Sequence, residues 1–305
     1  MQLFEPTSVL SNTVPVILNC KAGGGRSQAD VEAVRRAFEE AGLGADFTTF
    51  AAGDNLQRVA AKLLRERPAV LVAAGGDGTV SAVAEAVRGT GSALGVLPLG
   101  TQNHFAKDLG LPLEPTQAAR VIAQGRRRRV DLGEVNGRSF INNASLGIYP
   151  KIVRGRTERQ RRFGHSKRTA MLWATAAALD RLSLVELRLE LDGRVEDCRA
   201  PFVFVGNNDY ALEGFEIGTR ARLDAGQLNV YTTRRSSALG LLGLALRAIF
   251  RRLRQADDFM ESAVRSLRVE SRRPRLLVAI DGELRTMETP LEFGVVPGAL
   301  EVIVP

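Results

Sequence analysis

Apolar runs and segments of helical periodicity alternate along the first third of the chain. The apolar runs predict β-strands at 14–18, 69–74 and 93–97, and 46–50, rich in Phe and Thr, predicts a further strand. Between them, apolar residues recur every three or four positions and predict helices near 31–41, 56–64 and 80–87. Such alternation is typical of a parallel β-sheet with helices on both faces, and ligands of these sheets bind beyond the carboxyl ends of the strands.

The pattern changes after about residue 128, where short strand-like runs replace the helical spacing. These runs predict strands at 128–135, 138–142, 185–191, 200–205, 227–232, 264–269, 276–280 and 300–304. Asn136-Gly137 and Asp192-Gly193 are typical of tight turns between antiparallel strands. We therefore expect an α/β domain over 1–130 and a β-rich domain over 131–290, with the last strand, near 290–305, returning to the first domain.

Composition and charge favour a globular protein with anionic partners. Hydrophobic residues make up 45% of the 305 positions, enough to fill a core, and the net charge is +8. Aromatic residues are sparse at 6% and no basic patch is interleaved with them, so we expect no nucleic-acid partner. We find no signal-peptide pattern and no apolar run of about 18 residues that could span a membrane. Two cysteines, Cys20 and Cys198, fit a reducing cytoplasm.

Three glycine-rich segments lie at the ends of predicted strands, at 21–25, 75–79 and 98–103. Glycine lets the backbone approach a phosphate closely, and the helix that follows supplies N–H donors. None of the three is a Walker A loop or a dinucleotide-binding fingerprint. A single glycine-rich turn can be purely steric, but three at successive strand ends indicate phosphate binding.

The order of these and later segments resembles the diacylglycerol kinase catalytic-domain family. That family includes bacterial lipid kinases and sphingosine kinases and is related to NAD kinases. The similar segments are Gly75-Gly76-Asp77-Gly78-Thr79, 95–103, 105–112, 130–133, Asn142-Asn143-Ala144-Ser145-Leu146-Gly147, Gly206-Asn207-Asn208, 223–226 and Asp281-Gly282-Glu283. They cover nearly the whole chain in the family's order.

The resemblance implies a three-layer α/β domain of the NAD-kinase and diacylglycerol-kinase type, followed by a β-rich, sandwich-like domain. It also implies that Mg²⁺ and ATP serve as cofactors and that ATP binds between the two domains. The residues expected at the nucleotide are Asn19, Lys21, Gly23, Thr49, Gly75, Gly76, Asp77, Gly78, Thr79, Thr101 and Asn103.

An acid–base residue is expected in Asp281-Gly282-Glu283. Taken alone, Asp-Gly is the commonest signal for a plain hairpin turn. The resemblance instead implies that Asp281 is the general base, with Glu283 in support, because phosphoryl transfer needs a carboxylate to accept the proton of the attacking hydroxyl. Asp77 and Asp131 are the candidates for the Mg²⁺–water network.

Three positions depart from the family pattern. His104 follows Asn103 where an aspartate is usual, and Ala82 stands where many members carry glutamate. Ala225 replaces the second aspartate of a turn that holds a structural Mg²⁺ in some bacterial members. Because a hard oxygen ligand is lost there, that structural metal is not expected.

Two basic segments could bring the chain to a membrane. Residues 154–168 are rich in arginine, and 238–254 combine an apolar helical face with Arg247, Arg251 and Arg254. A basic amphipathic helix binds an anionic lipid surface, although a core-packed helix with a solvated basic edge fits the pattern equally well. Residues 126–129 fit a solvated strand entrance better than a nucleic-acid patch.

The sequence therefore predicts a cytoplasmic, peripherally membrane-associated lipid kinase. Its partners would be ATP, a lipid substrate and an anionic membrane surface, with diacylglycerol the default acceptor and a sphingoid base or another glycerolipid as alternatives. A kinase for a soluble acceptor, as NAD kinases are, and a non-catalytic nucleotide- or lipid-binding protein are the competing hypotheses. The oligomeric state stays open, a homo-oligomer included.

Overall fold

The computed structural model describes residues 13–19, 28–50, 55–148, 150, 184–213, 216–233 and 259–305. The chain divides into two compact units. The first comprises Met1–Leu132 and Pro297–Pro305, and the second comprises Gly133–Val296. The predicted glycine-rich turn at 23–25 and the basic segments 154–168 and 238–254 lie outside the described residues.

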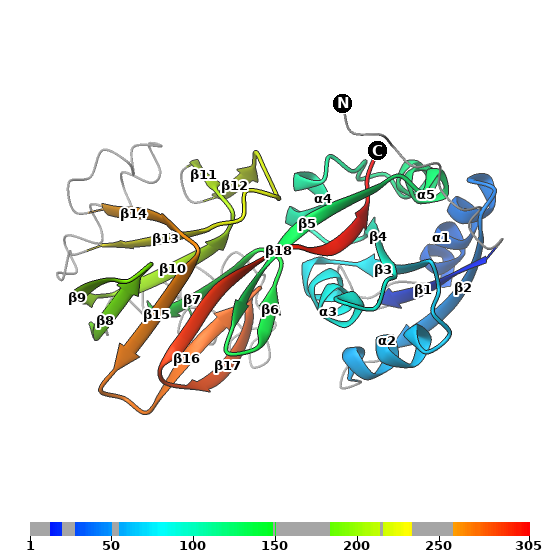
Figure 1. The fold of residues 1–305 in the computed structure, drawn as a ribbon. Coiled ribbons are helices and arrows are strands. Elements are labelled where there is room, and N and C mark those ends of the chain that lie inside the picture. Colours follow the sequence, from blue (N-terminus) through cyan, green and yellow to red (C-terminus); the bar gives the residue numbers. More distant parts are fainter. Residues whose placement is uncertain are drawn as a thin grey trace, which may run out of the picture. The chain divides into compact units, whose positions relative to one another are not determined.

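The first unit is a parallel sheet covered by helices. Its elements are β1 (Thr13–Asn19), α1 (Gln28–Glu40), β2 (Gly44–Phe50), α2 (Leu56–Leu64), β3 (Val70–Gly75), α3 (Asp77–Val87), β4 (Ala93–Pro98), α4 (His104–Asp108), α5 (Pro115–Gln124), the start of β5 (Arg127–Val135) and the end of β18 (Leu291–Ile303). The strand order is β2-β1-β3-β4-β18, with all neighbours parallel. Helices α1 and α5 lie on one face of the sheet, and α2 and α3 lie on the other (Figure 1).

The central strands of this sheet are apolar because both of their faces are covered. Every residue of β3 and of β4 is buried, as expected for strands in the middle of a three-layer domain. Side chains that point to either face meet a helix, so the strands read as continuous apolar runs.

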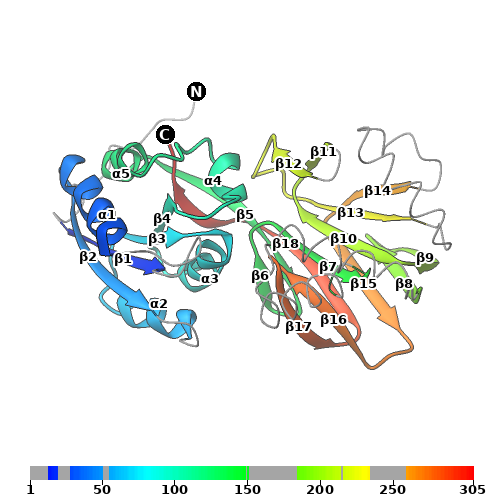
Figure 2. The same cartoon turned by 180° about the vertical axis from the view of Figure 1, so that it is seen from behind.

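The second unit is built from antiparallel strands in two sheets. Its elements are the end of β5, β6 (Arg138–Phe140), β7 (Asn143–Gly147), β8 (Val185–Leu191), β9 (Arg194–Ala200), β10 (Phe202–Asn207), β11 (Tyr210–Glu213), β12 (Glu216–Arg220), β13 (Leu228–Thr233), β14 (Phe259–Val264), β15 (Ser266–Ser271), β16 (Arg275–Ile280), β17 (Glu283–Glu288) and the start of β18. One sheet has the order β14-β13-β10-β7-β16-β17, and β18, β15, β8 and β9 lie side by side in the other (Figure 2). A further pair, β11 and β12, forms a two-stranded sheet.

The two larger sheets of this unit share one hydrophobic core. Leu187 and Leu267 from one sheet belong to the same buried cluster as Leu146, Val205 and Val278 from the other. Along β8 the burial alternates strictly, with apolar residues facing this core and charged residues facing out. The unit is therefore a β-sandwich, which confirms the predicted fold class.

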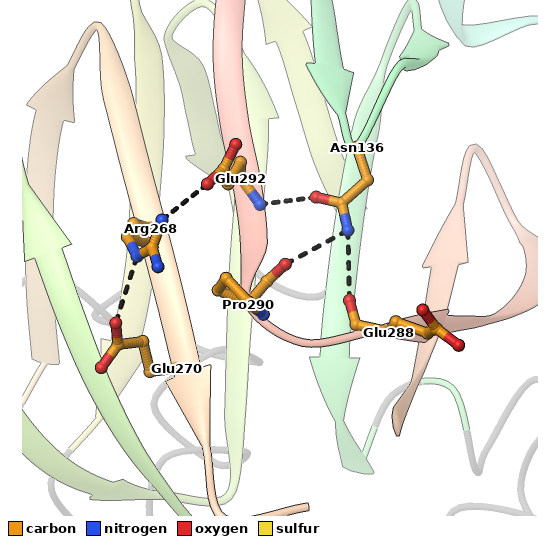
Figure 3. A network of polar contacts seen from close by, with 6 residues as sticks. All are labelled: Asn136, Arg268, Glu270, Glu288, Pro290 and Glu292. Atoms are coloured by element: carbon orange, nitrogen blue, oxygen red, sulfur yellow. Dashed lines mark hydrogen bonds and ion pairs between the residues drawn. The ribbon is translucent and has the colours of Figure 1, made fainter. Parts of the chain in front are cut away.

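The side chain of Asn136 clamps the turn between β5 and β6 to a neighbouring segment (Figure 3). Asn136 and Gly137 both have positive φ, 44° and 78°, as the predicted turn between β5 and β6 requires. The Asn136 side chain donates to the carbonyl groups of Glu288 (3.1 Å) and Pro290 (3.2 Å) and accepts from the Glu292 N–H (2.7 Å). One asparagine thus ties the β5–β6 turn to the segment that joins β17 and β18.

Several elements differ from the sequence prediction. The strand predicted at 264–269 corresponds to β15, which begins only at Ser266, because the chain breaks at Arg265, where the Asp192 carboxylate accepts its N–H (3.1 Å). Helices α4 and α5 and strands β7, β9, β11, β12, β14 and β17 were not predicted. Strand β6 ends at Phe140, two residues early, because the next backbone N–H groups turn toward Asp281.

Candidate active site

Two glycine-rich loops of the first unit touch at the ends of β3 and β4. The Leu99 N–H donates to the Gly75 carbonyl (2.9 Å), which brings the backbones together. A Cβ atom at Gly100 would lie 2.5 Å from the Gly76 Cα, closer than any real side chain approaches backbone. This contact requires glycine for steric reasons, so part of the glycine pattern serves loop packing.

Asp77 fastens the two loops together. Its carboxylate accepts from the N–H groups of Asn103 (Oδ2, 3.0 Å) and His104 (Oδ1, 2.7 Å). Asn103 in turn accepts from the Gly100 N–H (2.9 Å) and donates to the Gly100 carbonyl (3.0 Å). Because His104 takes part through its backbone, this clamp does not depend on which side chain stands at position 104.

The start of α3 offers a place for an anion. In any α-helix the first N–H groups have no partner within the helix, and here they belong to Asp77 and Gly78. The positive end of the helix dipole also favours negative charge. Next in the chain, Thr79 is buried, and its hydroxyl accepts from the Asn19 side chain (3.0 Å), which ties the end of β1 to α3.

Most of the predicted nucleotide residues of the described chain gather around these loops. Contacts and chain neighbours bring together Asn19, Gly75, Gly76, Asp77, Gly78, Thr79 and Asn103. Thr101 is exposed in the same loop as Gly100. Thr49 is exposed on β2, where it lies beside Leu18 of β1. Lys21 and Gly23 lie outside the described residues.

The two aspartates predicted at Mg²⁺ are both engaged by backbone groups. Asp77 holds two N–H groups, and Asp131, 3% exposed on β5, accepts from the Gly298 N–H (2.8 Å). Within the described ranges no group of three or more His, Cys, Asp or Glu residues could hold a metal ion. These residues do not form a metal cage made of protein alone. Mg²⁺ in kinases is held largely by phosphate oxygens and water and needs no such cage.

In the second unit, Asp281 occupies the turn between β16 and β17. Its φ of 45°, followed by 83° at Gly282, is the left-handed pair that the predicted Asp-Gly turn requires. The side chain of Glu283, the next residue, is 54% exposed and pairs with Arg285 (3.1 Å). Glu283 therefore begins β17 on a solvated surface.

Three consecutive backbone N–H groups hold the Asp281 carboxylate. Ile141 donates to Oδ2 (2.9 Å), and Asn142 (2.9 Å) and Asn143 (3.0 Å) donate to Oδ1. The Asp281 N–H donates back to the Asn143 carbonyl (2.8 Å). The carboxylate is thus oriented by the backbone of residues 141–143.

Sequence reasoning did not assign roles to the residues around Asp281. The loop 141–143 and, behind it, Asn207 and Arg220 carry these contacts. The signal was present, because Asn142-Asn143 and Gly206-Asn207-Asn208 belong to the segments that resemble the family. A polar run at a strand end can equally be a plain turn, so the sequence did not reveal what these side chains bind.

Tyr231 lies in the same sheet, on β13. Burial raises the pKa of Tyr231 to about 12, although hydrogen bonds from neighbours such as Asn229 act in the opposite direction. The phenol therefore stays protonated at neutral pH, and Tyr231 does not compete with Asp281 as a proton acceptor.

The structure describes the surroundings of Ala82 and Ala225, two of the positions expected to depart from the family pattern. Ala82 is 7% exposed in α3, where it packs as part of the core. The Ala225 N–H donates to the side-chain oxygen of Asn208 (2.9 Å), a fully buried residue. The turn at 224–226 is thus held by a protein side chain.

Comparison with known families identifies the family of the chain. The family model described as "Diacylglycerol kinase catalytic domain" matches residues 13–135. A second, "YegS C-terminal NAD kinase beta sandwich-like domain", matches residues 147–304. The chain belongs to the diacylglycerol kinase catalytic-domain family. The family resemblance seen in the sequence is thereby confirmed, and so is the expectation of an enzyme of the lipid kinase type.

Individual members of the diacylglycerol kinase family support this assignment. A protein of Pseudomonas aeruginosa named "Probable lipid kinase YegS-like" is 34% identical over 300 residues, covering 93% of this chain and 91% of its own. A "Diacylglycerol kinase" of Staphylococcus aureus is 31% identical over 187 residues, covering 58% and 56%. A solved diacylglycerol kinase structure from Bacillus anthracis matches the fold with a TM-score of 0.71 at 19% identity, covering 96% and 97%. In the described part of the chain studied here, no helix is long and apolar enough to cross a membrane.

Proposed function

We propose that the protein transfers the γ-phosphoryl group of Mg·ATP to a hydroxyl group of a membrane lipid, with diacylglycerol as the first acceptor to test. Kinases of this family use ATP, and the named relatives supply the lipid class. The observation that carries the proposal is the Asp281 carboxylate, which three backbone N–H groups orient in the Asp-Gly-Glu segment where the family resemblance places the general base.

In the proposed nucleotide site, the phosphates of ATP bind at the loops 75–79 and 98–103. The N–H groups of Asp77 and Gly78 and the positive end of α3 favour the phosphate charge. The Asp77 clamp keeps the second loop in place while the nucleotide binds. Mg²⁺, when bound with the nucleotide, supplies neutralisation of the phosphate charge.

In the proposed chemical step, Asp281 accepts the proton of the lipid hydroxyl. The lipid oxygen forms a bond to the γ-phosphorus as the bond from that phosphorus to the β–γ bridging oxygen breaks. The products are a phosphorylated lipid and ADP, and the proton then leaves Asp281 for solvent. General-base catalysis of this kind contributes about 10²- to 10⁴-fold to a rate.

Peripheral binding to an anionic membrane is part of the proposal. The net charge of +8 and the basic segments of the sequence favour such a surface. Salt-sensitive co-sedimentation with anionic vesicles is the expected behaviour, since exposed charges are screened by salt. Vesicle binding that depends neither on lipid charge nor on salt concentration would contradict peripheral binding to an anionic membrane.

The test is phosphorylation of a mixed lipid extract by γ-labelled ATP and Mg²⁺, comparing the wild type with Asp281→Asn. A labelled lipid formed by the wild type alone is expected, and its identity names the acceptor. A parallel reaction with NAD covers the soluble alternative, because the second matched family model names an NAD kinase-like sandwich. Label in NAD and in no lipid would overturn the lipid assignment.

A further inference from the structure

A buried arginine lies behind the loop that holds Asp281. Arg220, the last residue of β12, is 4% exposed. Its Nη1 donates to the carbonyl groups of Ile141 (2.6 Å) and Asn207 (3.0 Å), and its Nη2 donates to the Asn142 side chain (3.0 Å). The guanidinium also lies 5.1 Å from the ring centroid of Tyr210. Four neighbours thus fix this side chain in one position.

One peptide group links Arg220 to Asp281. The oxygen of the peptide between Ile141 and Asn142 accepts from Arg220 and from the Asn207 side chain (3.1 Å). The nitrogen of the same peptide donates to the Asp281 carboxylate. Hydrogen bonds that share a peptide polarise one another, so a cation at the oxygen strengthens the N–H as a donor.

The next peptide repeats the arrangement with a neutral donor. The carbonyl of Asn142 accepts from the Asn207 backbone N–H (2.8 Å), and the N–H of Asn143 donates to Asp281. Two consecutive peptides are therefore held at their oxygens by buried groups and present their N–H groups to one carboxylate. The loop cannot move away from Asp281 without breaking contacts to Arg220 or Asn207.

We propose that Arg220 is a positioning residue for Asp281, acting through the peptide between Ile141 and Asn142. This rests on the proposed function only in that Asp281 is taken as the general base. The contacts themselves lie within the second unit and can be tested without any turnover.

The structural half of the test uses amide NMR of protein labelled with ¹⁵N-asparagine, which reports the N–H groups of both Asn142 and Asn143. Strong hydrogen bonds to a carboxylate place these signals downfield. Arg220→Met, which keeps an unbranched stem and removes the charge and the donors, is expected to move the Asn142 signal upfield. Unchanged Asn142 and Asn143 signals in a folded Arg220→Met protein would overturn the inference.

The kinetic half separates positioning from general stability. Arg220→Met is expected to lower kcat about tenfold with the KM for ATP unchanged, and to have no further effect in an Asp281→Asn background. Arg220→Lys keeps the cation but lacks the planar fork, so its kcat should lie between those of the wild type and Arg220→Met. If Arg220→Met does not fold, Arg220→Lys carries the test, and a wild-type kcat together with wild-type Asn142 signals would refute the proposal.

Asn136→Ala is the matched control, because it removes three hydrogen bonds in the same unit and leaves loop 141–143 untouched. It should lower the melting temperature and leave kcat unchanged; a fall in kcat as large as that of Arg220→Met would show that stability alone explains the effect. The proposed function fails separately, if Asp281→Asn retains wild-type turnover. In that case the amide signals still decide whether Arg220 organises the loop.

Discussion

Asp77 in the first unit and Asp281 in the second accept the same kind of hydrogen bond, but the two contacts have different roles. Each carboxylate accepts backbone N–H groups from a loop distant in sequence, two for Asp77 and three for Asp281. Asp77 stands at the start of a helix, where it joins two loops that are already packed through glycine. Asp281 stands in a left-handed turn, and the loop it binds is held from behind by Asn207 and Arg220.

The comparison predicts that the two sites tolerate substitution differently. Around Asp77 the carboxylate accepts from backbone N–H groups, so the clamp does not use the side chain of His104. Around Asp281 a buried side chain from a third segment supports the loop, so the arrangement depends on the identity of Arg220. We expect the first site to be sensitive to added bulk and the second to lost charge.

The largest expected effect comes from removing the proton acceptor. Asp281→Asn keeps the shape of the side chain but replaces one oxygen by an amide that cannot accept a proton, so kcat should fall about 10²- to 10⁴-fold. The Kd for ATP should stay at the wild-type value. Steady-state kinetics and calorimetric titration with ATP measure the two quantities, and a kcat within twofold of the wild type would remove Asp281 as the base.

Added bulk tests the glycine contact of the first unit. In Gly100→Ala the new methyl group meets the Gly76 Cα at 2.5 Å and the Asn103 Oδ1 at 2.7 Å, so the loops must separate. Overpacking of this kind costs about 1–3 kcal/mol, and we expect the Kd for ATP to rise about tenfold. Gly294→Ala, where a Cβ would meet nothing within 4 Å, is the control and should bind ATP normally. Equal ATP affinity in both variants would contradict the steric account.

Removal of charge at Asp77 tests the clamp between the loops. Asp77→Asn loses one of two charge-assisted hydrogen bonds, and because the residue is partly exposed we expect about 1 kcal/mol of lost stability. Urea unfolding measures the loss. His104→Ala keeps the backbone N–H that Asp77 accepts, so it should unfold like the wild type; a larger loss in His104→Ala than in Asp77→Asn would mean that the histidine side chain, and not the clamp, matters.

The smallest effect is expected at Asp192, a carboxylate with a purely structural clamp. Burial acts to raise the pKa of Asp192, but hydrogen bonds from Ser266 and Arg265 outweigh it and hold the pKa below its usual value. A lowered pKa means that the clamp stabilises the fold above about pH 4 and is lost as the pH falls through the folded-state pKa. The difference in melting temperature between the wild type and Asp192→Asn should therefore be larger at pH 7 than at pH 3. A difference independent of pH would be evidence that the charge of Asp192 does not stabilise the fold.

Local patterns were sufficient for most of the elements that position the two sites. The strands β1, β3 and β4 and the helices α1 to α3 follow the apolar spacing closely. Helix α5 was missed although its signals are present: Pro115 opens it, the Glu114 side chain accepts from its first N–H groups, and Gly125 ends it with a φ of 66°. Strand β9 gave no apolar alternation because it is an edge strand with mostly solvated side chains.

The sequence by itself determined the fold class, the family and the glycine-rich loops, because periodicity, turn residues and ordered segments are properties of short stretches of chain. Only the tertiary structure decided what the polar residues bind. Asp281 and Ile141 are 140 positions apart and Asp77 and His104 are 27 apart, so no local pattern records their contact. Long-range hydrogen bonds depend on how strands and loops are brought together by the core, and for that reason the role of Arg220 became visible only in the folded chain.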